Sequence, residues 1–360
     1  MSTVRPGNFW IVFLALWPAT VFPAHAASEP ETATLPFVSR ADSPPRKIVV
    51  GSALADFEGT LAARLVLAAK LIDEAGHEAR RKLGEDAHLD LFVLPEFALG
   101  AGSSPVASER AVELDGPVLD ALGAKAREYR TWIIAPMTLR EAQGDKRISN
   151  AAVLVNRAGG VAGIFRKVHP IADDAGVFEG GVTPGADYPV FTCDFGRLGI
   201  LICWDMAYEE AWNALAAGGA EIVALPSASP QTLRPMAEAL RHHYFVINSA
   251  PRDNASVYDP IGRTIAQTTT AGVVVQQIDL AYGILHWSEA LHNGKAFTDR
   301  FGAKAGYNYS EREDTGVFWS NDPHVTIGTM IRELGLHEMP DVIAEMENAR
   351  RKQLLAPAQP

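Results

Sequence analysis

Three side chains of different chemical types, Glu96, Lys167 and Cys203, each lie at or just past the C-terminal end of an apolar run. In open α/β sheets ligands bind at this edge of the strands, so the three side chains would meet there. Together they form a complete acyl-transfer set. A cysteine is a strong nucleophile as a thiolate, a carboxylate can pass a proton to a leaving amine, and a lysine ammonium can stabilise an oxyanion.

Each of these residues also has an ordinary explanation when it is taken alone. Glu96 could form an ion pair with a helix, and Lys167 could end its strand in solvent, as most lysines do. Cys203 could fill the core as a small apolar side chain. Their occurrence on one predicted sheet edge favours chemistry over three separate coincidences.

The strand that delivers Cys203 is the apolar segment 198–203. The residues that follow, 205–216, have the pattern of a helix with Asp205 near its N-cap. Backbone N–H groups and the positive end of a helix dipole at such a junction favour a thiolate over a thiol. His169 is close to Lys167 in sequence, and we interpret it as a structural neighbour.

Buried strands and amphipathic helices alternate through residues 47–285, with hairpins between them. Strands are predicted at 47–54, 89–94, 131–135, 148–156, 161–167, 221–226, 244–250 and 273–278, and hairpins at 188–203 and 256–267. Helices are predicted at 60–82, from 116 onward, at 206–217 and at 236–243. This alternation implies a layered α/β fold of mixed sheets with helices packed outside.

The segments that carry the three candidate residues resemble the signature segments of the nitrilase superfamily of carbon–nitrogen hydrolases, in the same order and at similar spacing. These segments are Leu94–Phe97, Phe165–His169 and Gly199–Asp205, and Asp259–Gly262 is similar to the family's late hairpin. The resemblance covers about residues 47–285. It implies a four-layer αββα sandwich with a Glu–Lys–Cys triad at Glu96, Lys167 and Cys203.

Members of this superfamily hydrolyse amides, nitriles or N-carbamoyl groups through a cysteine thioester. The resemblance therefore implies a small amide-type substrate, no metal or organic cofactor, and a homodimer or higher homo-oligomer. Many members use a second glutamate between the lysine and the cysteine; Glu179 is the best match, although its distance from Gly185 departs slightly from the commonest pattern. Trp204, Ser227 and Ala228 are expected to line the substrate pocket, while Trp204 could equally belong to the core.

We expect hydrolysis of an amide or an N-carbamoyl compound. The aspartate in Cys203-Trp204-Asp205 looks more like the amidase and carbamoylase branches than the nitrilase branch. Three alternatives stay open: a nitrilase, an acyltransferase of the same superfamily in which an amine replaces water, and a secreted binding protein with an inactive site.

The first 26 residues have the pattern of a secretory signal peptide. Arg5 precedes a 14-residue apolar run at 9–22, and Ala24 and Ala26 occupy the two positions that a signal peptidase reads. This run is too short for a membrane span, and no later run reaches about 18 apolar residues, so no span is expected in the mature chain. We expect a periplasmic or secreted protein in which residues 27–46 form an extended linker.

Charge and cysteine content limit the partners and the redox chemistry. Loss of Arg5 with the signal peptide would change the net charge from −11 to −12, which argues against nucleic acid or an anionic membrane as a partner. In a hairpin of 188–194 with 198–203, Cys193 would lie opposite residue 199, roughly 13 Å from Cys203 along the strand. A disulfide needs Cα atoms within about 7 Å, so both thiols should be free, with Cys193 as core filler.

Residues 286–360 show a weaker pattern. They are rich in aromatic residues and glycine up to Trp319, and a charged helix ends at Arg350–Lys352. Their apolar positions are too few to predict a core. We expect a C-terminal extension that packs on the 47–285 domain or on a dimer partner; a separate binding module is the alternative.

Overall fold

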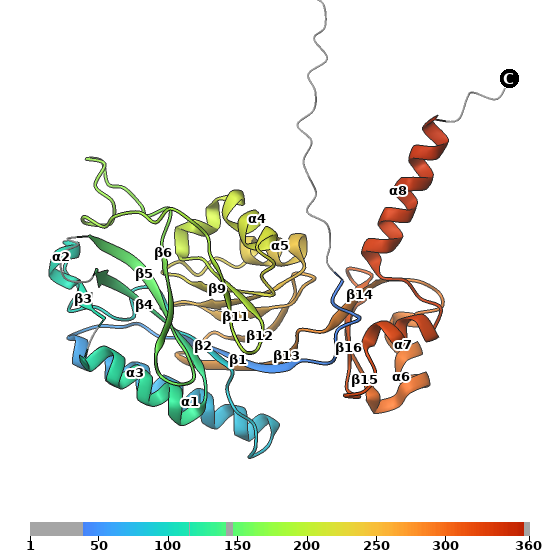
Figure 1. The fold of residues 1–360 in the computed structure, drawn as a ribbon, viewed down its shortest axis with the longest axis horizontal. Helices are drawn as coiled ribbons and strands as arrows, with labels where there is room; N and C mark the ends of the chain where they lie inside the picture. The colour runs from blue at the N-terminus through green and yellow to red at the C-terminus, as the bar shows by residue number, and fades with distance from the viewer. Residues whose placement is uncertain (1–38, 115, 142–146, 356–360) are drawn as a thin grey trace, which may run out of the picture. The chain divides into compact units, whose positions relative to one another are not determined.

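The computed structural model describes residues 39–114, 116–141 and 147–355. The predicted signal peptide and the predicted linker up to residue 38 lie outside these residues. The described chain forms two large mixed β-sheets and a third sheet of three strands (Figure 1). No helix in the described ranges is long and apolar enough to cross a membrane.

The first sheet is built around β1, which pairs in parallel with β2 and antiparallel with β13. The short β3 (Val112–Glu113) pairs with β4 outside the main order. In sheet order the main strands are β13 (Gly272–Asp279), β1 (Lys47–Leu54), β2 (Leu91–Val93), β4 (Trp132–Arg140), β5 (Ile148–Val155) and β6 (Val161–Arg166).

The second sheet has a parallel centre, β8–β9–β10, with antiparallel strands on either side. In sheet order its strands are β12 (Thr264–Thr268), β11 (Ala255–Tyr258), β10 (Phe245–Ser249), β9 (Ile222–Pro226), β8 (Arg197–Ile200) and β7 (Val190–Thr192).

Helices cover the outer face of each large sheet (Figure 1). The alternation of side chains along β1 shows the layers, because Val49 packs in the cluster with α1 and α3, whereas Ile48 and Val50 pack in the cluster shared by the two sheets. The helices are α1 (Leu61–Leu83), α2 (Ala107–Arg110), α3 (Gly116–Tyr129), α4 (Glu209–Ala217) and α5 (Leu233–His242). The predicted αββα sandwich is confirmed.

The helix predicted from Asp205 begins later than expected. Residues Cys203–Ala207 form a 3-10 turn, and α4 starts at Glu209, where two acidic side chains suit the positive helix end. The Asp205 carboxylate instead accepts a hydrogen bond from Ile202 N at 3.1 Å. This contact caps the short 3-10 turn, so Asp205 belongs to that turn and not to the start of α4.

The hairpin that contains both cysteines has a different register from the predicted one. Cys193 N donates to Gly196 O at 2.8 Å, so the turn contains only two residues and Cys193 lies beside Gly196 rather than opposite residue 199. Asp194 in this turn is held by Trp132 and Arg157. Cys203 consequently follows the residue beside Cys193 by more positions along the chain than predicted. Both thiols are free and buried, as expected.

The C-terminal residues do contain a hydrophobic core, contrary to expectation. Its strands are β14 (Tyr282–His286), β16 (Thr315–Ser320) and β15 (Ala305–Ser310), and its helices are α6 (Lys295–Phe301) and α7 (Ile327–Glu333). Phe297 and Phe318 are fully buried in this core. The sequence did not predict this core because its aromatic residues and glycines do not repeat at the spacing of a helix or a strand. The last helix, α8 (Met339–Leu355), has no buried residue.

Residues 39–46, predicted as the end of an extended linker, are anchored in the fold. Ala41 is 2 % exposed and belongs to the core of the third sheet. Arg40 and Arg46 both form ion pairs with Glu221, the residue before β9. These residues therefore fasten the beginning of the described chain to the second sheet and to the third.

Candidate active site

Glu96 and Lys167 meet at the C-terminal ends of two strands of the first sheet. Lys167 directly follows β6, and Glu96 lies in the turn after β2. The Lys167 Nζ donates a hydrogen bond to Glu96 Oε1 at 2.8 Å, and neither side chain is more than 2 % exposed. A buried charge needs a partner, and here each of these two groups provides one for the other.

Glu179 joins the same cluster from the loop that follows Lys167. Lys167 Nζ donates to Glu179 Oε1 at 2.6 Å. The backbone of Glu179 has a positive φ of 40°, and Arg110 holds it there by donating from Nη2 to the Glu179 carbonyl at 2.6 Å. At the neighbouring Gly180, a Cβ would lie 1.8 Å from Pro105 O, so only glycine permits this close approach.

Burial alone would lower the pKa of Lys167. The negative charges of Glu96 and Glu179 outweigh that effect and raise the pKa above its ordinary value. The lysine is therefore a fixed cation at the centre of the cluster.

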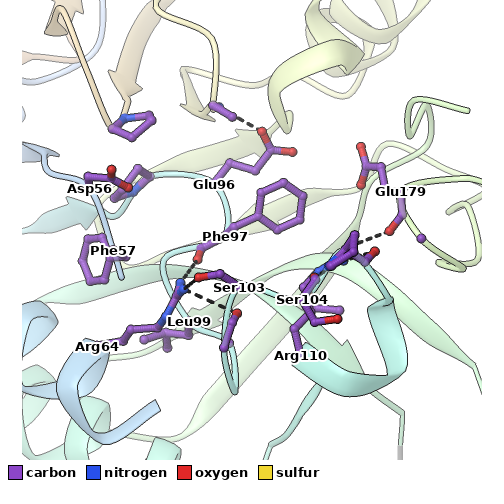
Figure 2. A pocket seen from close by; sticks show the side chains of 18 of the residues that line it. Asp56, Phe57, Arg64, Glu96, Phe97, Leu99, Ser103, Ser104, Arg110 and Glu179 are labelled. Carbon is purple, nitrogen blue, oxygen red and sulfur yellow. Dashed lines mark hydrogen bonds between the residues drawn. The ribbon is translucent and has the colours of Figure 1, made fainter. Parts of the chain in front are cut away.

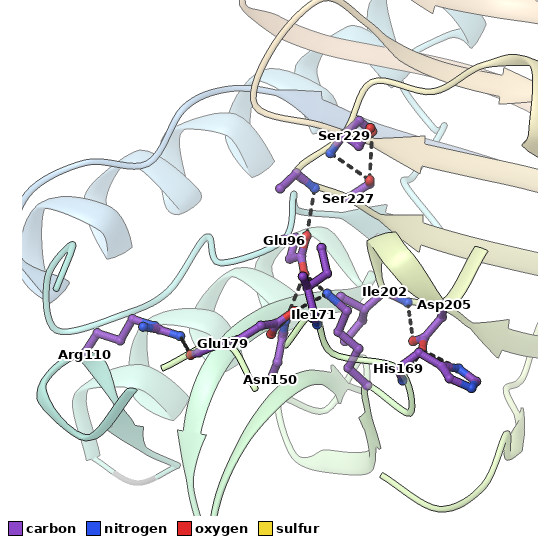
Figure 3. A network of polar contacts seen from close by, with 12 residues as sticks. Glu96, Arg110, Asn150, His169, Ile171, Glu179, Ile202, Asp205, Ser227 and Ser229 are labelled. Carbon is purple, nitrogen blue, oxygen red and sulfur yellow. Dashed lines mark hydrogen bonds and ion pairs between the residues drawn. The ribbon is translucent and has the colours of Figure 1, made fainter. Parts of the chain in front are cut away.

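Asn150 completes the cluster, and its role was not predicted. Its Nδ2 donates to Glu96 Oε1 at 2.8 Å and to Glu179 Oε2 at 2.9 Å (Figure 3). Lys167 and Asn150 therefore each bridge the same two carboxylates. The side chain is 1 % exposed, within the otherwise largely apolar strand β5. A buried amide in an apolar strand needs a polar partner, and that was the available signal.

Replacement of Asn150 tests whether this bridge positions the two glutamates. In Asn150→Leu both N–H donors are lost, and we expect kcat for amide hydrolysis to fall by about 100-fold, since small misplacements of reacting groups have effects of this size. Asn150→Asp should recover part of that loss as the pH is lowered, because the protonated carboxyl regains a donor. The measurement is kcat for amide hydrolysis by both variants and the wild type across a series of pH values.

Asn248 provides the matched control. It is also fully buried and donates to a backbone carbonyl, Leu225 O at 3.3 Å, outside the glutamate cluster. Asn248→Leu should lower the melting temperature like Asn150→Leu while leaving kcat within about twofold. Equal losses of kcat in the two leucine variants would show that Asn150 acts only on stability.

Cys203 lies at a sharp turn after β8. It is the first residue of the 3-10 turn, its φ is 46°, and it is 6 % exposed. A non-glycine residue with positive φ is strained, and such strain is common where a strand-to-helix turn presents a nucleophile. The expectation of a helix end that favours the thiolate is wrong, because α4 begins only at Glu209 and the pKa of Cys203 is raised rather than lowered.

The surroundings of Cys203 keep its thiol protonated. Burial, and then the charge of Glu96, raise the pKa of Cys203 to about 11, although Lys167 and hydrogen bonds from Ser227 and the Ala228 N–H act in the opposite direction. The thiol is neutral at pH 7, so a base has to accept its proton when it reacts.

Asp205 links the segment that carries Cys203 to the segment that carries Lys167. Its Oδ2 accepts from Ile202 N, and its Oδ1 accepts from His169 N at 2.7 Å (Figure 3). The carboxylate is fully buried. His169 itself stacks on Tyr208 with ring centroids 3.5 Å apart, which agrees with a structural role.

A cavity of about 540 Å³ opens beside this cluster (Figure 2). Glu96, Glu179 and Ala228 line it, and the Ala228 N–H donates to Glu96 Oε2 at 2.9 Å. Trp204 and Ser227, which were expected to line the pocket, do not line this cavity. Trp204 is 41 % exposed in the 3-10 turn, and the Ser227 hydroxyl donates to Ser229 O.

Comparison with known proteins identifies the family. Residues 47–284 match the model of the carbon-nitrogen hydrolase family. The chain belongs to the carbon-nitrogen hydrolase family. The resemblance that the three motifs predicted is thereby confirmed, together with its placement in the nitrilase superfamily.

Individual relatives of this carbon-nitrogen hydrolase are distant. Human deaminated glutathione amidase is 28 % identical over 200 residues, which are 47 % of this chain and 60 % of that protein. A probable nitrilase of Schizosaccharomyces pombe is 30 % identical over 109 residues, 30 % of this chain and 39 % of that protein. The chain thus spans about two fifths to three fifths of the length of these two relatives.

A solved structure supports the fold of this carbon-nitrogen hydrolase. Nit3 of Saccharomyces cerevisiae, a member of branch 10 of the nitrilase superfamily, superposes with a TM-score of 0.54 at 18 % identity, over 74 % of this chain and 97 % of that chain. Within the described ranges, no group of three or more His, Cys, Asp or Glu side chains is arranged to hold a metal ion.

Proposed function

We propose that this protein is an exported hydrolase that cleaves a small amide or N-carbamoyl compound through a thioester on Cys203. The observation that carries the proposal is the buried cluster in which Lys167 Nζ contacts both Glu96 and Glu179, beside a protonated thiol and a cavity of about 540 Å³. In this cluster Cys203 is the nucleophile, Glu96 is the proton carrier and Lys167 is the fixed cation.

In the first half of the reaction, Cys203 Sγ attacks the substrate carbonyl carbon while its proton passes to Glu96. The C=O electron pair moves onto oxygen, and the resulting oxyanion is stabilised by Lys167 and by the backbone N–H of Trp204. Glu96 then gives the proton to the leaving nitrogen as the C–N bond breaks. Ammonia or an amine departs, and the acyl group stays on sulfur as a thioester.

In the second half, Glu96 takes a proton from water as the water oxygen attacks the thioester carbon. The C–S bond breaks as Glu96 returns this proton to the sulfur, and a carboxylic acid, or a carbamic acid from an N-carbamoyl compound, leaves. Lys167 again stabilises the oxyanion. Hydrogen bonds from Asn150 and to Glu179 keep the Glu96 carboxylate and the Lys167 ammonium in position through both halves of the reaction.

The location and assembly are part of the same proposal. The signal-peptide pattern of residues 1–26 supports export to the periplasm or out of the cell, with a mature chain that begins at Ala27. The superfamily habit of forming dimers supports a homodimer or a higher homo-oligomer.

The test is a substrate panel combined with mass spectrometry. Primary amides, N-carbamoyl amino acids and nitriles are offered to the purified protein, ammonia release is measured, and samples quenched in acid are searched for an acyl adduct on the peptide that contains Cys203. We expect ammonia release from amides or carbamoyl compounds and an acyl mass on Cys203.

Other outcomes of this panel would replace the proposal with one of its alternatives. Turnover of nitriles alone would make the protein a nitrilase. An acylated product that forms only when an amine acceptor is added would make it an acyltransferase. If the panel gives no turnover and no adduct on Cys203, a binding protein with an inactive site is favoured.

A further inference from the structure

Asp205 lies between the two chain segments that carry the nucleophile and the lysine. Its Oδ2 accepts a hydrogen bond from the Ile202 N–H at 3.1 Å, and Ile202 directly precedes Cys203. Its Oδ1 accepts from the His169 N–H at 2.7 Å, two residues after Lys167 (Figure 3). A single carboxylate therefore fixes the Cys203 turn to the segment that follows β6.

The strength of this link depends on the charge of Asp205. A backbone N–H binds an ionised oxygen roughly twice as strongly as a neutral one. Protonation turns one of the two oxygens into a hydroxyl, which is a weaker acceptor, and the side chain has no exposed surface where water could compensate. The position of Cys203 relative to Lys167 then rests on a weaker link, and small displacements of reacting groups lower rates by large factors.

The titratable groups around Asp205 come from four parts of the chain. Its own 3-10 turn holds Cys203. The segment after β6 holds Lys167 and His169, and His169 Nδ1 lies 3.5 Å from Asp205 Oδ1. The segment before β7 and the beginning of α4 add three groups that contact His169, namely Tyr188, Tyr208 and Glu210. The carboxylate is thus bordered by two groups that can carry a positive charge.

Burial has the largest effect on the pKa of Asp205. It outweighs the two backbone hydrogen bonds and the charges of Lys167 and protonated His169, and it raises the pKa of Asp205 to about 6. The side chain is therefore ionised at pH 8 and mostly protonated at pH 5. Because this pKa is higher in the folded protein than in an unfolded chain, the folded state takes up the proton more readily, and protonation of Asp205 does not favour unfolding.

We propose that Asp205, only as a carboxylate, holds Cys203 in its working position against Lys167, so that mild acid lowers the rate of hydrolysis while the protein stays folded. This inference rests on the proposed hydrolysis through Cys203. Asp205 is a positioning residue, because it acts through the backbone N–H groups of Ile202 and His169. The site thereby contains a reversible acid switch that is separate from the nucleophile and the proton carrier.

A purely structural role is the competing explanation, since any buried carboxylate with two hydrogen bonds supports the fold around it. The two explanations differ in one measurable way. If Asp205 only supports the fold, its replacement lowers kcat by the same factor at every pH. If its charge positions Cys203, the replacement matters at neutral pH and matters little in acid, where the wild-type side chain has already lost its charge.

The test is the ratio of kcat between the wild type and Asp205→Asn, measured with the best amide from pH 5 to pH 8. Asparagine has the size of the protonated acid and offers one neutral oxygen as acceptor. Titration of the other groups of the site, Glu96 included, affects both proteins and largely cancels in the ratio. We expect a ratio of about 30 at pH 8 that falls to about 4 at pH 5. Circular dichroism at each pH shows that both proteins stay folded.

Asp259 provides the matched control. It is 2 % exposed, burial raises its pKa to about 6, and it accepts from the N–H groups of Ile261 and Arg263 at 3.1 and 2.9 Å. These bonds stay within one hairpin turn and join no segments of the site. In Asp259→Asn, kcat should stay within about twofold of the wild type at every pH.

His169→Phe is a second variant, which decides if Asp205→Asn does not fold. Phenylalanine keeps the backbone N–H and can stack on Tyr208, but it removes the imidazole whose charge lowers the pKa of Asp205. The loss of kcat in acid should therefore begin at a higher pH than in the wild type. A ratio for Asp205→Asn that does not change with pH, or an unshifted acid loss in His169→Phe, would overturn the inference while amide hydrolysis stands. Absence of turnover with every amide would instead overturn the proposed function.

Discussion

Cys203→Ala is expected to lower kcat for the best amide by at least ~10⁴-fold, because no other group can form the thioester. The variant should still fold, since alanine is an apolar side chain slightly smaller than cysteine and the site loses one sulfur atom. The measurements are ammonia release, near-ultraviolet circular dichroism and the melting temperature.

The second cysteine makes this experiment well controlled. Cys193 is 7 % exposed, similar to Cys203, but it lies in the β7–β8 turn away from the glutamate cluster. Burial raises the pKa of Cys193 to about 12, and this thiol does not share the glutamate and lysine cluster that surrounds Cys203. Cys193→Ala should retain wild-type turnover. Substantial turnover in Cys203→Ala would rule out the thioester mechanism.

Lys167→Met is expected to lower both activity and stability. The substitution removes the only cation that bridges the Glu96 and Glu179 carboxylates among the described residues. Breaking a buried ion pair by removal of one partner costs about 3–5 kcal/mol. Loss of the charge that stabilises the oxyanion should lower kcat by at least ~10²–10³-fold. Urea unfolding and kcat measured on the same preparation give the two values.

A second substitution separates the two effects. In Lys167→Met with Glu179→Gln, one buried carboxylate is neutralised, so the free energy of unfolding should recover in part while kcat stays low. Lys125→Met serves as the control, because Lys125 also bridges two acids, Asp73 and Glu128, but is 21 % exposed. Its loss should cost at most about 1 kcal/mol and leave kcat unchanged. A kcat for Lys167→Met within tenfold of wild type would show that the lysine does not stabilise the oxyanion.

The sequence predicted the layers of the fold well because long apolar strands and amphipathic helices carry strong periodic signals. The helix predicted at 60–82 is found at Leu61–Leu83, with Thr60 accepting a hydrogen bond from Ala63 N. The third sheet was missed because its core is assembled from residues that are far apart, including Ala41 and Phe297. No local pattern reports a contact of that kind.

In the candidate site too, residues at strand ends could be predicted from the sequence, whereas roles that depend on contacts between distant residues could not. Glu96 and Lys167 could be placed together because strand ends meet at one sheet edge, and the structure brings them into contact. Asn150 gave a weaker signal, because an amide in an apolar strand indicates that a polar partner is needed but does not say which one. The role of Asp205 as a link between two loops depends on tertiary contacts that its helical setting in the sequence did not suggest.

The pairing of β1 with β13 affects how this chain folds during synthesis. Until residues 272–279 have been made, one edge of β1 has unpaired backbone groups beside apolar side chains such as Ile48 and Val50. Pairing between such distant strands also folds slowly. The nascent chain is consequently exposed to mispairing and aggregation through most of its translation. The yield of folded protein should rise when synthesis is cooled, because association of exposed apolar side chains weakens at lower temperature.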